Sequence, residues 1–345
     1  MRGKFLKWAV LGIFLSVLSG AAAYYYMRPH IPPNLAGINH FANPDKQKNE
    51  QQETMPFPGW KDAPRKRALA VIIDNALAAR PQSGLELADV VVEIPVEGGM
   101  TRFLAIISRN ETELVGPIRS ARPYLVDLAK EYNGILVHAG GSEEAVQAID
   151  REKPDHLDEI EGGPQVGAAF WRVPDRVKPH NLYASSESLR RAAKELNYNL
   201  TVPPPEHSYI VKGTEISGQP VKEINIFYPN RENQIRYTYN KERKVFERFM
   251  AEKPHVNPKG EQMAAANIVV QYVPYRVLNG DGNLQLILHG EGEALVFRDG
   301  KVVKGLWQKQ PGGFTRFVDE KGKSIPLVPG PTWIQVVTKG TRVDY

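Results

Sequence analysis

The sequence contains no cysteine among its 345 residues. That absence excludes disulfide bonds, cysteine-ligated zinc, iron–sulfur clusters and thiol catalysis. Net charge is also low: the formal charge is +5, and Arg2, Lys4 and Lys7 at the N-terminus leave only +2 for the rest of the chain. Because nucleic-acid binding requires a basic face, this balance predicts no nucleic-acid partner.

Cofactor-binding motifs are missing as well. The segment 290–292 (Gly-Glu-Gly) lacks the remainder of a dinucleotide-binding fingerprint, so it indicates a turn. No repeat of fixed period is present. The sequence therefore predicts no cofactor, while 42% hydrophobic residues over this length can build sizeable cores.

The N-terminus carries the one long apolar run. Basic residues precede residues 8–27, a stretch of about 20 residues that matches the thickness of a bilayer core. The charge asymmetry predicts a single-pass anchor in the cell membrane with an extracytoplasmic body, and the tyrosines at 24–26 are typical of a membrane interface. The alternative is signal-peptide cleavage near Ala23 and secretion, because residues 21–23 offer a run of small side chains.

The rest of the chain divides by composition. Residues 28–60 are rich in Pro, Asn, Gln and Lys and predict a disordered tether after the 1–27 anchor. Residues 61–200 alternate apolar runs with helical patterns, which predicts an α/β domain. After the prolines at 203–205, residues 201–345 show short strands and turn signals, which predict a mainly β domain. The predicted fold class is therefore α+β.

Individual elements follow from periodicity and end signals. In the first domain we predict strands at 68–73, 89–95, 102–108 and 134–138, and helices at 123–132, 142–150 and 185–196. In the second we predict strands at 223–228, 234–239, 267–272, 284–289, 294–298, 315–318 and 332–337.

Arginines gather in glycine-punctuated blocks near these predicted strand ends. Arginine is always charged and presents a planar fork of donors, so such blocks favour binding of a phosphate or carboxylate. Arg119 and Arg122 lie three residues apart at a helix start, where cations oppose the macrodipole unless an anion or buried carboxylate compensates them. The candidate ligand-binding residues are Asn75, Arg80, Arg102, Arg119, Ser120, Arg122, Ser142, His180 and Asn181.

Each block also has a plainer interpretation. Asp74 follows an apolar run, where ligands gather in α/β sheets, yet Asx residues also form local turns. Arg80 reaches either an anion or Asp74, and the glycines after Glu97 suit a hairpin. His138 is either a general base or a hydrogen-bonded core residue. Asp74, His138 and His180 lack close metal-ligand spacing, so no metal is predicted.

These blocks resemble the YerB-like lipoprotein family, a two-domain envelope family of Gram-positive bacteria. The resemblance covers nearly the whole body and rests on IDN at 73–75, ARPQSG at 79–84, EGG at 97–99, TRF at 101–103, GPIRSARPY at 116–124, HAGGS at 138–142, PHN at 179–181, NIVVQ at 267–271, GLW at 305–307 and GPTWI at 330–334. It implies an extracytoplasmic protein with a separate C-terminal domain, and it supplies no established reaction. Relatives often carry a lipid-accepting cysteine where this chain has Ala21, so the helix itself would have to anchor this member.

Three functions remain open at this point. The first is an anchored envelope protein that binds an anionic ligand or partner in an arginine-lined cleft. The second is an envelope hydrolase or phosphotransferase, with Asp74, Glu97 or His138 as acid or base and the arginines steadying the transition state. The third is a structural or interaction protein of a surface or spore layer, whose polar blocks are internal salt bridges.

Overall fold

The computed structural model describes residues 65–345 except 211–214 and 279–282. The predicted anchor at 8–27 and tether at 28–60 lie outside the described residues. Within the part described, no helix is long and apolar enough to cross a membrane.

The first half of the described chain holds seven strands. They are β1 (Leu69–Asp74), β2 (Val90–Pro95), β3 (Thr101–Ile107), β4 (Ile135–His138), β5 (His156–Asp158), β6 (Phe170–Arg172) and β7 (Leu182–Ala184). β1 is buried at all six positions, as its unbroken apolar sequence requires. The four strands predicted here are present, while β5, β6 and β7 are too short to have been recognised from periodicity.

Four α-helices accompany these strands. They are α2 (Pro123–Glu131), α3 (Glu143–Glu152), α4 (Gly163–Gly167) and α5 (Ser186–Glu195). Local sequence explains their starts: Pro123 occupies the first turn of α2, Ser142 caps α3 by accepting from the Ala145 amide, and Ser185 forms a capping box with Ser188. The three predicted helices are confirmed. Short 3₁₀ turns are η1 (Leu77–Ala79), η2 (Leu85–Leu87), η3 (Glu97–Gly99) and η4 (Arg231–Asn233).

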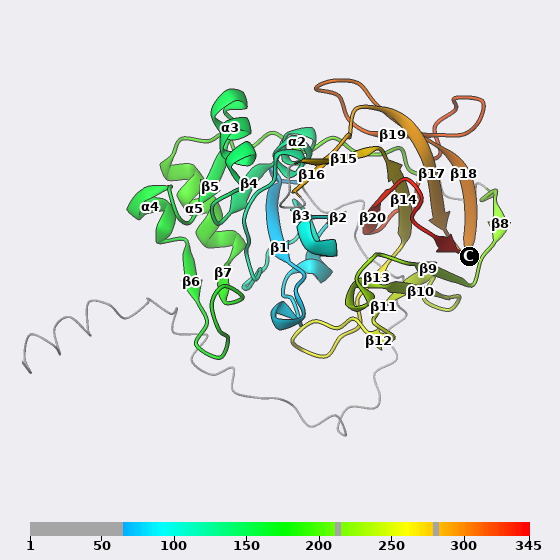
Figure 1. The fold of residues 1–345 in the computed structure, drawn as a ribbon, viewed down its shortest axis with the longest axis horizontal. Coiled ribbons are helices and arrows are strands. Elements are labelled where there is room, and N and C mark those ends of the chain that lie inside the picture. Colours follow the sequence, from blue (N-terminus) through cyan, green and yellow to red (C-terminus); the bar gives the residue numbers. More distant parts are fainter. Residues whose placement is uncertain (1–64, 211–214, 279–282) are drawn as a thin grey trace, which may run out of the picture. The chain divides into compact units, whose positions relative to one another are not determined.

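The second half is mostly β. Its strands are β8 (Gln219–Pro220), β9 (Glu223–Ile226), β10 (Ile235–Asn240), β11 (Val245–Met250), β12 (Lys253–Pro254), β13 (Ala264–Ala265), β14 (Asn267–Val273), β15 (Tyr275–Leu278), β16 (Asn283–Leu286), β17 (Gly290–Arg298), β18 (Lys301–Lys309), β19 (Arg316–Val318), β20 (Thr332–Thr338) and β21 (Val343–Asp344). A mainly β C-terminal half is therefore confirmed (Figure 1).

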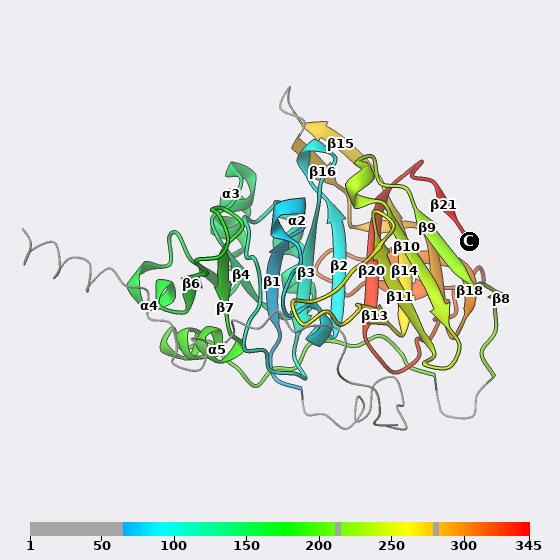
Figure 2. The ribbon, with the colours of Figure 1, turned by 90° about the horizontal axis from the view of Figure 1, so that it is seen from below.

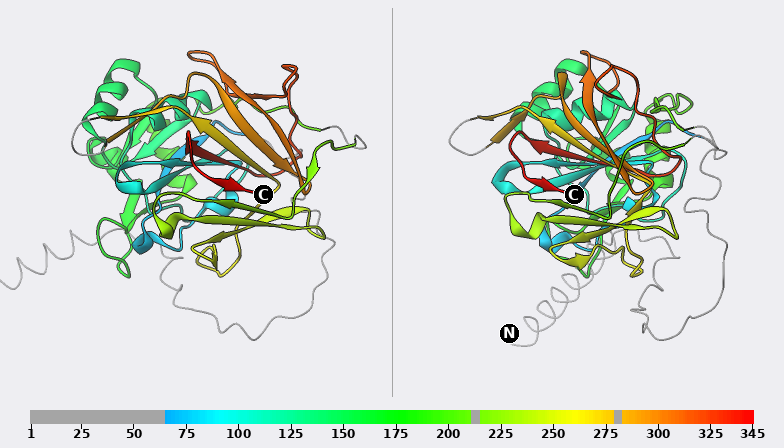
Figure 3. Two further views of the ribbon diagram at one scale, coloured as in Figure 1. Left: turned by 45° about the vertical axis from the view of Figure 1, so that its right-hand side comes forward. Right: turned by 90° about the vertical axis from the view of Figure 1, so that its right-hand side faces the viewer.

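One large sheet runs through both halves. Its order is β19-β18-β17-β14-β20-β2-β3-β1-β4-β5, with β8 attached to β18. The two halves join where β2 pairs in parallel with β20, so Val92 lies opposite Ile334. Figure 2 shows β20, in red, next to β2, in cyan. A smaller sheet of order β12-β11-β10-β9-β21, with β13 on β11, lies beneath the large one in Figure 3.

The hydrophobic core follows the two faces of the large sheet. Alternate residues of β1 divide between them: Val71 and Ile73 face α5 and the smaller sheet, while Ala70 and Ile72 face α2 and α3. Trp333 belongs to the first face and Trp307 to the second, and each face includes residues from both halves. The two halves therefore share both cores, because β20 inserts beside β2 and continues both faces.

Two further sequence expectations need correction. The first half is a mixed sheet, not a regular α/β alternation, because η3 turns β2 directly into β3 as an antiparallel pair. Gly98 and Gly99 there have φ of 68° and 69°, which glycine adopts without strain. The segment 290–292 is not a turn but the start of β17: a Cβ on Gly292 would lie 2.5 Å from the Trp307 ring of β18, so only glycine lets that indole pack.

Candidate functional site

Asp74 ends β1 and carries three interactions at once. Its Oδ1 accepts a hydrogen bond from the Ala76 amide at 2.9 Å, the Asx turn that its position suggests. Its Oδ2 lies 2.7 Å from Nδ1 of His180 and 3.1 Å from Nε of Arg119. The carboxylate is buried, so a local turn and an ionic cluster coexist at the same strand end.

Glu97 forms a second ionic centre at the β2–β3 turn. Arg122 donates from Nε to Oε2 at 2.9 Å and pairs through Nη2 with Oε1. Arg102 approaches the same Oε1 at 3.7 Å and donates from Nη1 to the carbonyl of Ser120 at 2.7 Å. Burial alone would raise the pKa of Glu97, but the hydrogen bond from Arg122 and the two guanidinium charges hold it below its ordinary value.

Arg102 joins the two centres, because β1 and β3 place it directly opposite Asp74. Burial, the neighbouring charge of Arg122 and, more weakly, that of Arg119 lower the pKa of Arg102 to about 10. We define the rim cluster as Asp74, Glu97, Arg102, Arg119, Arg122 and His180. The structure brings these six residues together. Within the cluster three guanidinium groups face two carboxylates, which leaves one excess positive charge, and the carboxylate of Glu144 also interacts with the charge of Arg122.

Arg119 is the most accessible of the three arginines, with 26% of its side chain exposed. Among the described residues Asp74 is its ionic partner, and its two terminal Nη groups donate no hydrogen bond. Its Nε faces Asp74 without hydrogen-bond geometry. Arg119 therefore presents two cationic donor groups to solvent, the arrangement that suits an oxyanion.

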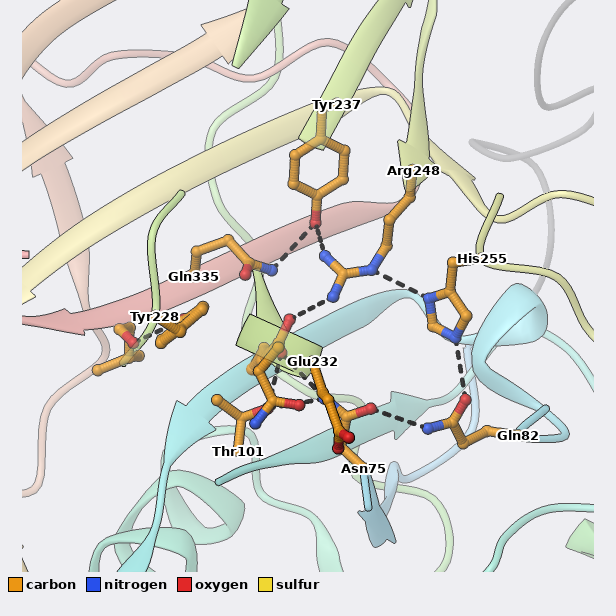
Figure 4. Close-up of polar contacts among 12 residues, drawn as sticks. Asn75, Gln82, Thr101, Tyr228, Glu232, Tyr237, Arg248, His255 and Gln335 are labelled. Atoms are coloured by element: carbon orange, nitrogen blue, oxygen red, sulfur yellow. Dashed lines mark hydrogen bonds and ion pairs between the residues drawn. The ribbon is translucent and has the colours of Figure 1, made fainter. Parts of the chain in front are cut away.

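Asn75 belongs to a different group of residues, shown in Figure 4, and Arg80 hydrogen-bonds to its carbonyl. Asn75 is fully buried; its amide donates to Glu93 at 3.2 Å and to Thr101 at 2.7 Å. Arg80 donates to the Asn75 carbonyl and, across to the C-terminal half, to the carbonyl of Glu232. The hydrogen-bonding groups of Asn75 thus face other protein groups, and Arg80 ties the two halves together.

These contacts belong to a closed ring of side chains, which we call the interior network. Arg248 donates to Glu93 Oε2 at 2.6 Å and from Nε to His255 Nδ1 at 3.0 Å. His255 Nε2 lies 2.9 Å from Gln82 Oε1, and Gln82 donates to Asn75 Oδ1 at 3.0 Å. Since Nδ1 of His255 accepts from Arg248, its proton is on Nε2. Tyr237 accepts from both Arg248 and Gln335.

The pKa values in this network are shifted by burial and by the neighbouring charges. Glu93 and Arg248 are both 0% exposed. Burial would lower the pKa of Arg248, but the adjacent Glu93 charge, with the hydrogen bonds of Tyr237 and Glu93, raises it. Burial and the Arg248 charge lower the pKa of His255 well below its usual range, which keeps its imidazole neutral. None of these three residues was a candidate from the sequence, although a glutamate inside an apolar strand is a recognisable signal.

Three further candidate residues lie outside the rim cluster and the interior network. His138 is buried, with Nδ1 2.9 Å from the Gly140 carbonyl and Nε2 3.1 Å from His156 Nδ1. Ser142 is the cap of α3. Asn181 accepts from Arg172 and donates to two backbone carbonyls of its own loop. These contacts give structural roles to all three, and no group of three metal-ligating side chains occurs in the described part of the chain.

Comparisons with known proteins agree with this architecture. Residues 58–199 match the N-terminal domain, and residues 224–334 the C-terminal domain, of a family described as protein of unknown function DUF3048. YerB of Bacillus subtilis (strain 168), whose name describes it as a lipoprotein, is 32% identical over 278 residues, 79% of this chain and 81% of its own. The chain belongs to this family.

The fold is shared as well. The crystal structure of YerB from Bacillus subtilis superposes with a TM-score of 0.74 at 29% identity, covering 86% of this chain and 97% of that one. The family resemblance seen in the sequence blocks is thereby confirmed. Many of those blocks lie in the rim cluster and the interior network, including 73–75, 79–84, 97–99 and 116–124.

Proposed function

We propose that this YerB-like protein binds an anionic group, a phosphate or carboxylate, at the rim cluster. The observation that carries the proposal is the state of Arg119: its two Nη groups donate to no described residue while three arginines face two carboxylates. A ligand oxyanion placed there accepts from Arg119 and neutralises the excess charge. Charge-assisted hydrogen bonds of this kind contribute about 1.5–3 kcal/mol each.

The location that we propose is the outer face of the cell membrane. The apolar run at 8–27 would span the bilayer and residues 28–60 would tether the body, with no lipid on Ala21. The lipoprotein name of the Bacillus relative supports an envelope setting for the family. Anionic groups of lipids, glycans and acidic peptides are all accessible there, and the rim cluster alone does not select among them.

Binding is best tested by titrating the full chain with inorganic phosphate, pyrophosphate and acetate in a calorimeter. We expect Arg119→Gln to weaken the tightest of these by at least tenfold, about 1.4 kcal/mol. The matched control is Arg243→Gln, since Arg243 is an exposed arginine with a carboxylate partner, Glu247, outside the rim cluster. Failure of all three probes to bind at about 10 mM, or equal binding by Arg119→Gln, would refute the proposal.

A second candidate is supported by the Asp74–His180 pair. The carboxylate holds Nδ1 of His180 at 2.7 Å, and Nε2 makes no hydrogen bond to a described residue. A carboxylate that orients a histidine beside a cation is an acid/base unit in many hydrolases. Glu97, engaged by two arginines, and buried His138 are less suited to that role. The enzymatic alternative requires turnover of a phosphate ester that His180→Ala abolishes while phosphate binding persists.

A further inference from the structure

Exposed apolar side chains gather along one edge of the large sheet. Strands β1, β2, β4, β5, β14 and β20 run in the same direction, so their carboxyl ends lie at one edge, which also holds the rim cluster. Nine large hydrophobic side chains are exposed in the described part of the chain. Six of them lie in segments at this edge, and we call these six the apolar edge: Leu77, Val146, Ile160, Val177, Tyr275 and Val277.

Two of these side chains flank the rim cluster on the side of β1. Leu77 lies in η1, directly after the end of β1. The carbonyl of Val177 accepts from the amide of His180, a member of the rim cluster, at 3.0 Å. Arg176 holds the same loop against η1 by donating to the carbonyl of Ala79 at 2.7 Å. Leu77 and Val177 are 59% and 81% exposed, so both project into solvent beside the candidate anion site.

Other residues of the apolar edge lie on either side of this pair. Ile160 follows β5, and a Cβ on Gly140 would lie 3.0 Å from its Cδ1. The carbonyl of Gly140 accepts from the amide of Ala121, in the connection before α2. Tyr275 and Val277 lie in β15, which follows β14. In Figure 1 and Figure 2 β15 and β16 lie beside α2, so this hairpin also borders the rim cluster.

The spacing of these side chains indicates the kind of ligand. β5 and β14 are six strands apart in the sheet order, which is about 30 Å at about 4.8 Å per strand. No single small ligand contacts side chains so far apart. The apolar side chains also lie on separate loops, next to exposed charged residues such as Glu161 and Lys178, whereas protein partners typically bury a contiguous apolar patch. Separate apolar tips around a phosphate-binding group suit a lipid bilayer, whose acyl boundary accepts the tips while its headgroups supply phosphate.

From this arrangement we infer that the folded body contacts the bilayer surface through the apolar edge. Leu77 and Val177 enter the headgroup layer, and Arg119 binds the phosphate of a membrane lipid. The contact rests on the anion binding proposed above, and it names the ligand of that site. Since the acids Glu161 and Asp175 are exposed at the same edge, attraction to net negative charge is weak, and we expect contact with zwitterionic phosphatidylcholine.

The absence of cysteine makes this contact directly measurable, because one introduced cysteine can be labelled selectively. The full chain carrying Val177→Cys or Leu77→Cys is labelled with the fluorophore NBD and reconstituted into nanodiscs of phosphatidylcholine. The nanodiscs are made with ordinary lipid or with lipid brominated on its acyl chains, since bromine quenches only a fluorophore that reaches the acyl region. We expect the emission at both sites to fall about twofold in brominated nanodiscs, as contact with the acyl boundary requires.

The matched controls are Val202→Cys and Leu196→Cys, which replace the same residue types at the opposite edge. Val202 and Leu196 are 39% and 37% exposed. The carbonyl of Leu200, between them, accepts from the amide of Arg67, just before β1 begins. We expect bromine to leave the emission of both control labels unchanged. All four positions are exposed, so labelling should leave the fold intact.

The bilayer contact is overturned if the labels at 177 and 77 are not quenched, or if the control labels are quenched equally. Shielding of these labels that is the same in ordinary and brominated lipid also overturns it, because a second copy of the chain would then cover the apolar edge. Arg119→Gln should reduce the quenching at Val177→Cys about threefold, and unchanged quenching would refute a lipid phosphate as the ligand of Arg119. Unquenched labels in a chain that still binds inorganic phosphate would refute the bilayer contact while the anion site stands.

Discussion

The rim cluster and the interior network both pair arginine with a carboxylate, but they differ in burial and in how completely their charges are paired. Each begins at the end of β1, at Asp74 in one case and Asn75 in the other, and each pairs arginine with a carboxylate. In the interior network Arg248 pairs with Glu93, and both side chains are fully buried with their hydrogen-bonding groups engaged. In the rim cluster three guanidinium groups share two carboxylates, and Arg119 remains partly exposed.

This difference in pairing follows from the difference in burial. A buried charge requires complete pairing, because an unpaired ion in the interior is strongly destabilising. An incompletely paired charge is tolerated near solvent, where water or a ligand completes it. Two adjacent residues at the same strand end therefore have different surroundings: Asn75 lies in the buried junction of the two halves, and Asp74 lies in the rim cluster that we propose as an anion site.

The largest expected effect comes from Arg248→Met. It removes the cation and leaves Glu93 buried without its ionic partner, so we expect a loss of about 3–5 kcal/mol in the free energy of unfolding. Urea denaturation measures the change. The double variant Glu93→Gln with Arg248→Met should recover part of this loss. A loss below about 1 kcal/mol for Arg248→Met would show that the interior network does not hold the halves together.

A smaller loss is expected from Gln82→Leu, which opens the ring without removing a charge. The Nε2–H of His255 then has no acceptor and Asn75 Oδ1 loses its donor. One buried unsatisfied group costs about 1–3 kcal/mol, and we expect a loss in that range by the same denaturation measurement. Unchanged stability would mean that water replaces the Gln82 side chain inside the ring.

For Arg119→Gln we expect the opposite result: a small effect on stability and a large effect on phosphate binding. We expect its free energy of unfolding to stay within about 1 kcal/mol of the natural chain, because a partly exposed ion pair contributes little. Its effect on phosphate binding should be tenfold or more, as argued above. Substantial destabilisation with unchanged binding would assign the rim cluster to structure, in agreement with the third function considered from the sequence.

The smallest effect concerns pH. The folded state lowers the pKa of Glu97 from its ordinary 4.5, so the folded protein binds a proton there less readily than the unfolded chain does. This contribution to stability is present above the unfolded pKa and is lost as pH falls below it. The stability difference between the natural chain and Glu97→Gln should therefore shrink between neutral pH and pH 3. A difference independent of pH would contradict this pairing.

Sequence reasoning recovered what local patterns determine. Apolar runs located β1 and β4, and end signals located α2 and α3, because caps and periodicity act within a few residues. The sequence offered Asp74 as a partner for Arg80, but the structure pairs Asp74 with Arg119 and gives Arg80 other acceptors. His180 was chosen only as a polar loop residue, and its contact with Asp74 depends on the folded loop.

The interior network was missed because its partners are distant along the chain. Glu93 and Arg248 are 155 residues apart, and His255 shows no spacing pattern of its own. The pairing of β2 with β20 has no side-chain signature either, since backbone hydrogen bonds between strands carry no residue code. A glutamate within the apolar β2 run is a signal for a buried polar partner, but it does not say which residue that partner is.

The place of β20 in the sheet has a consequence for how this chain is made. During synthesis from the N-terminus, β2 emerges more than two hundred residues before β20, its parallel partner strand. Until residues 332–338 arrive, one side of β2 is an apolar strand edge open to other chains, a known route to aggregation. A chain that ends before β20 would leave one edge of β2 without its parallel partner strand.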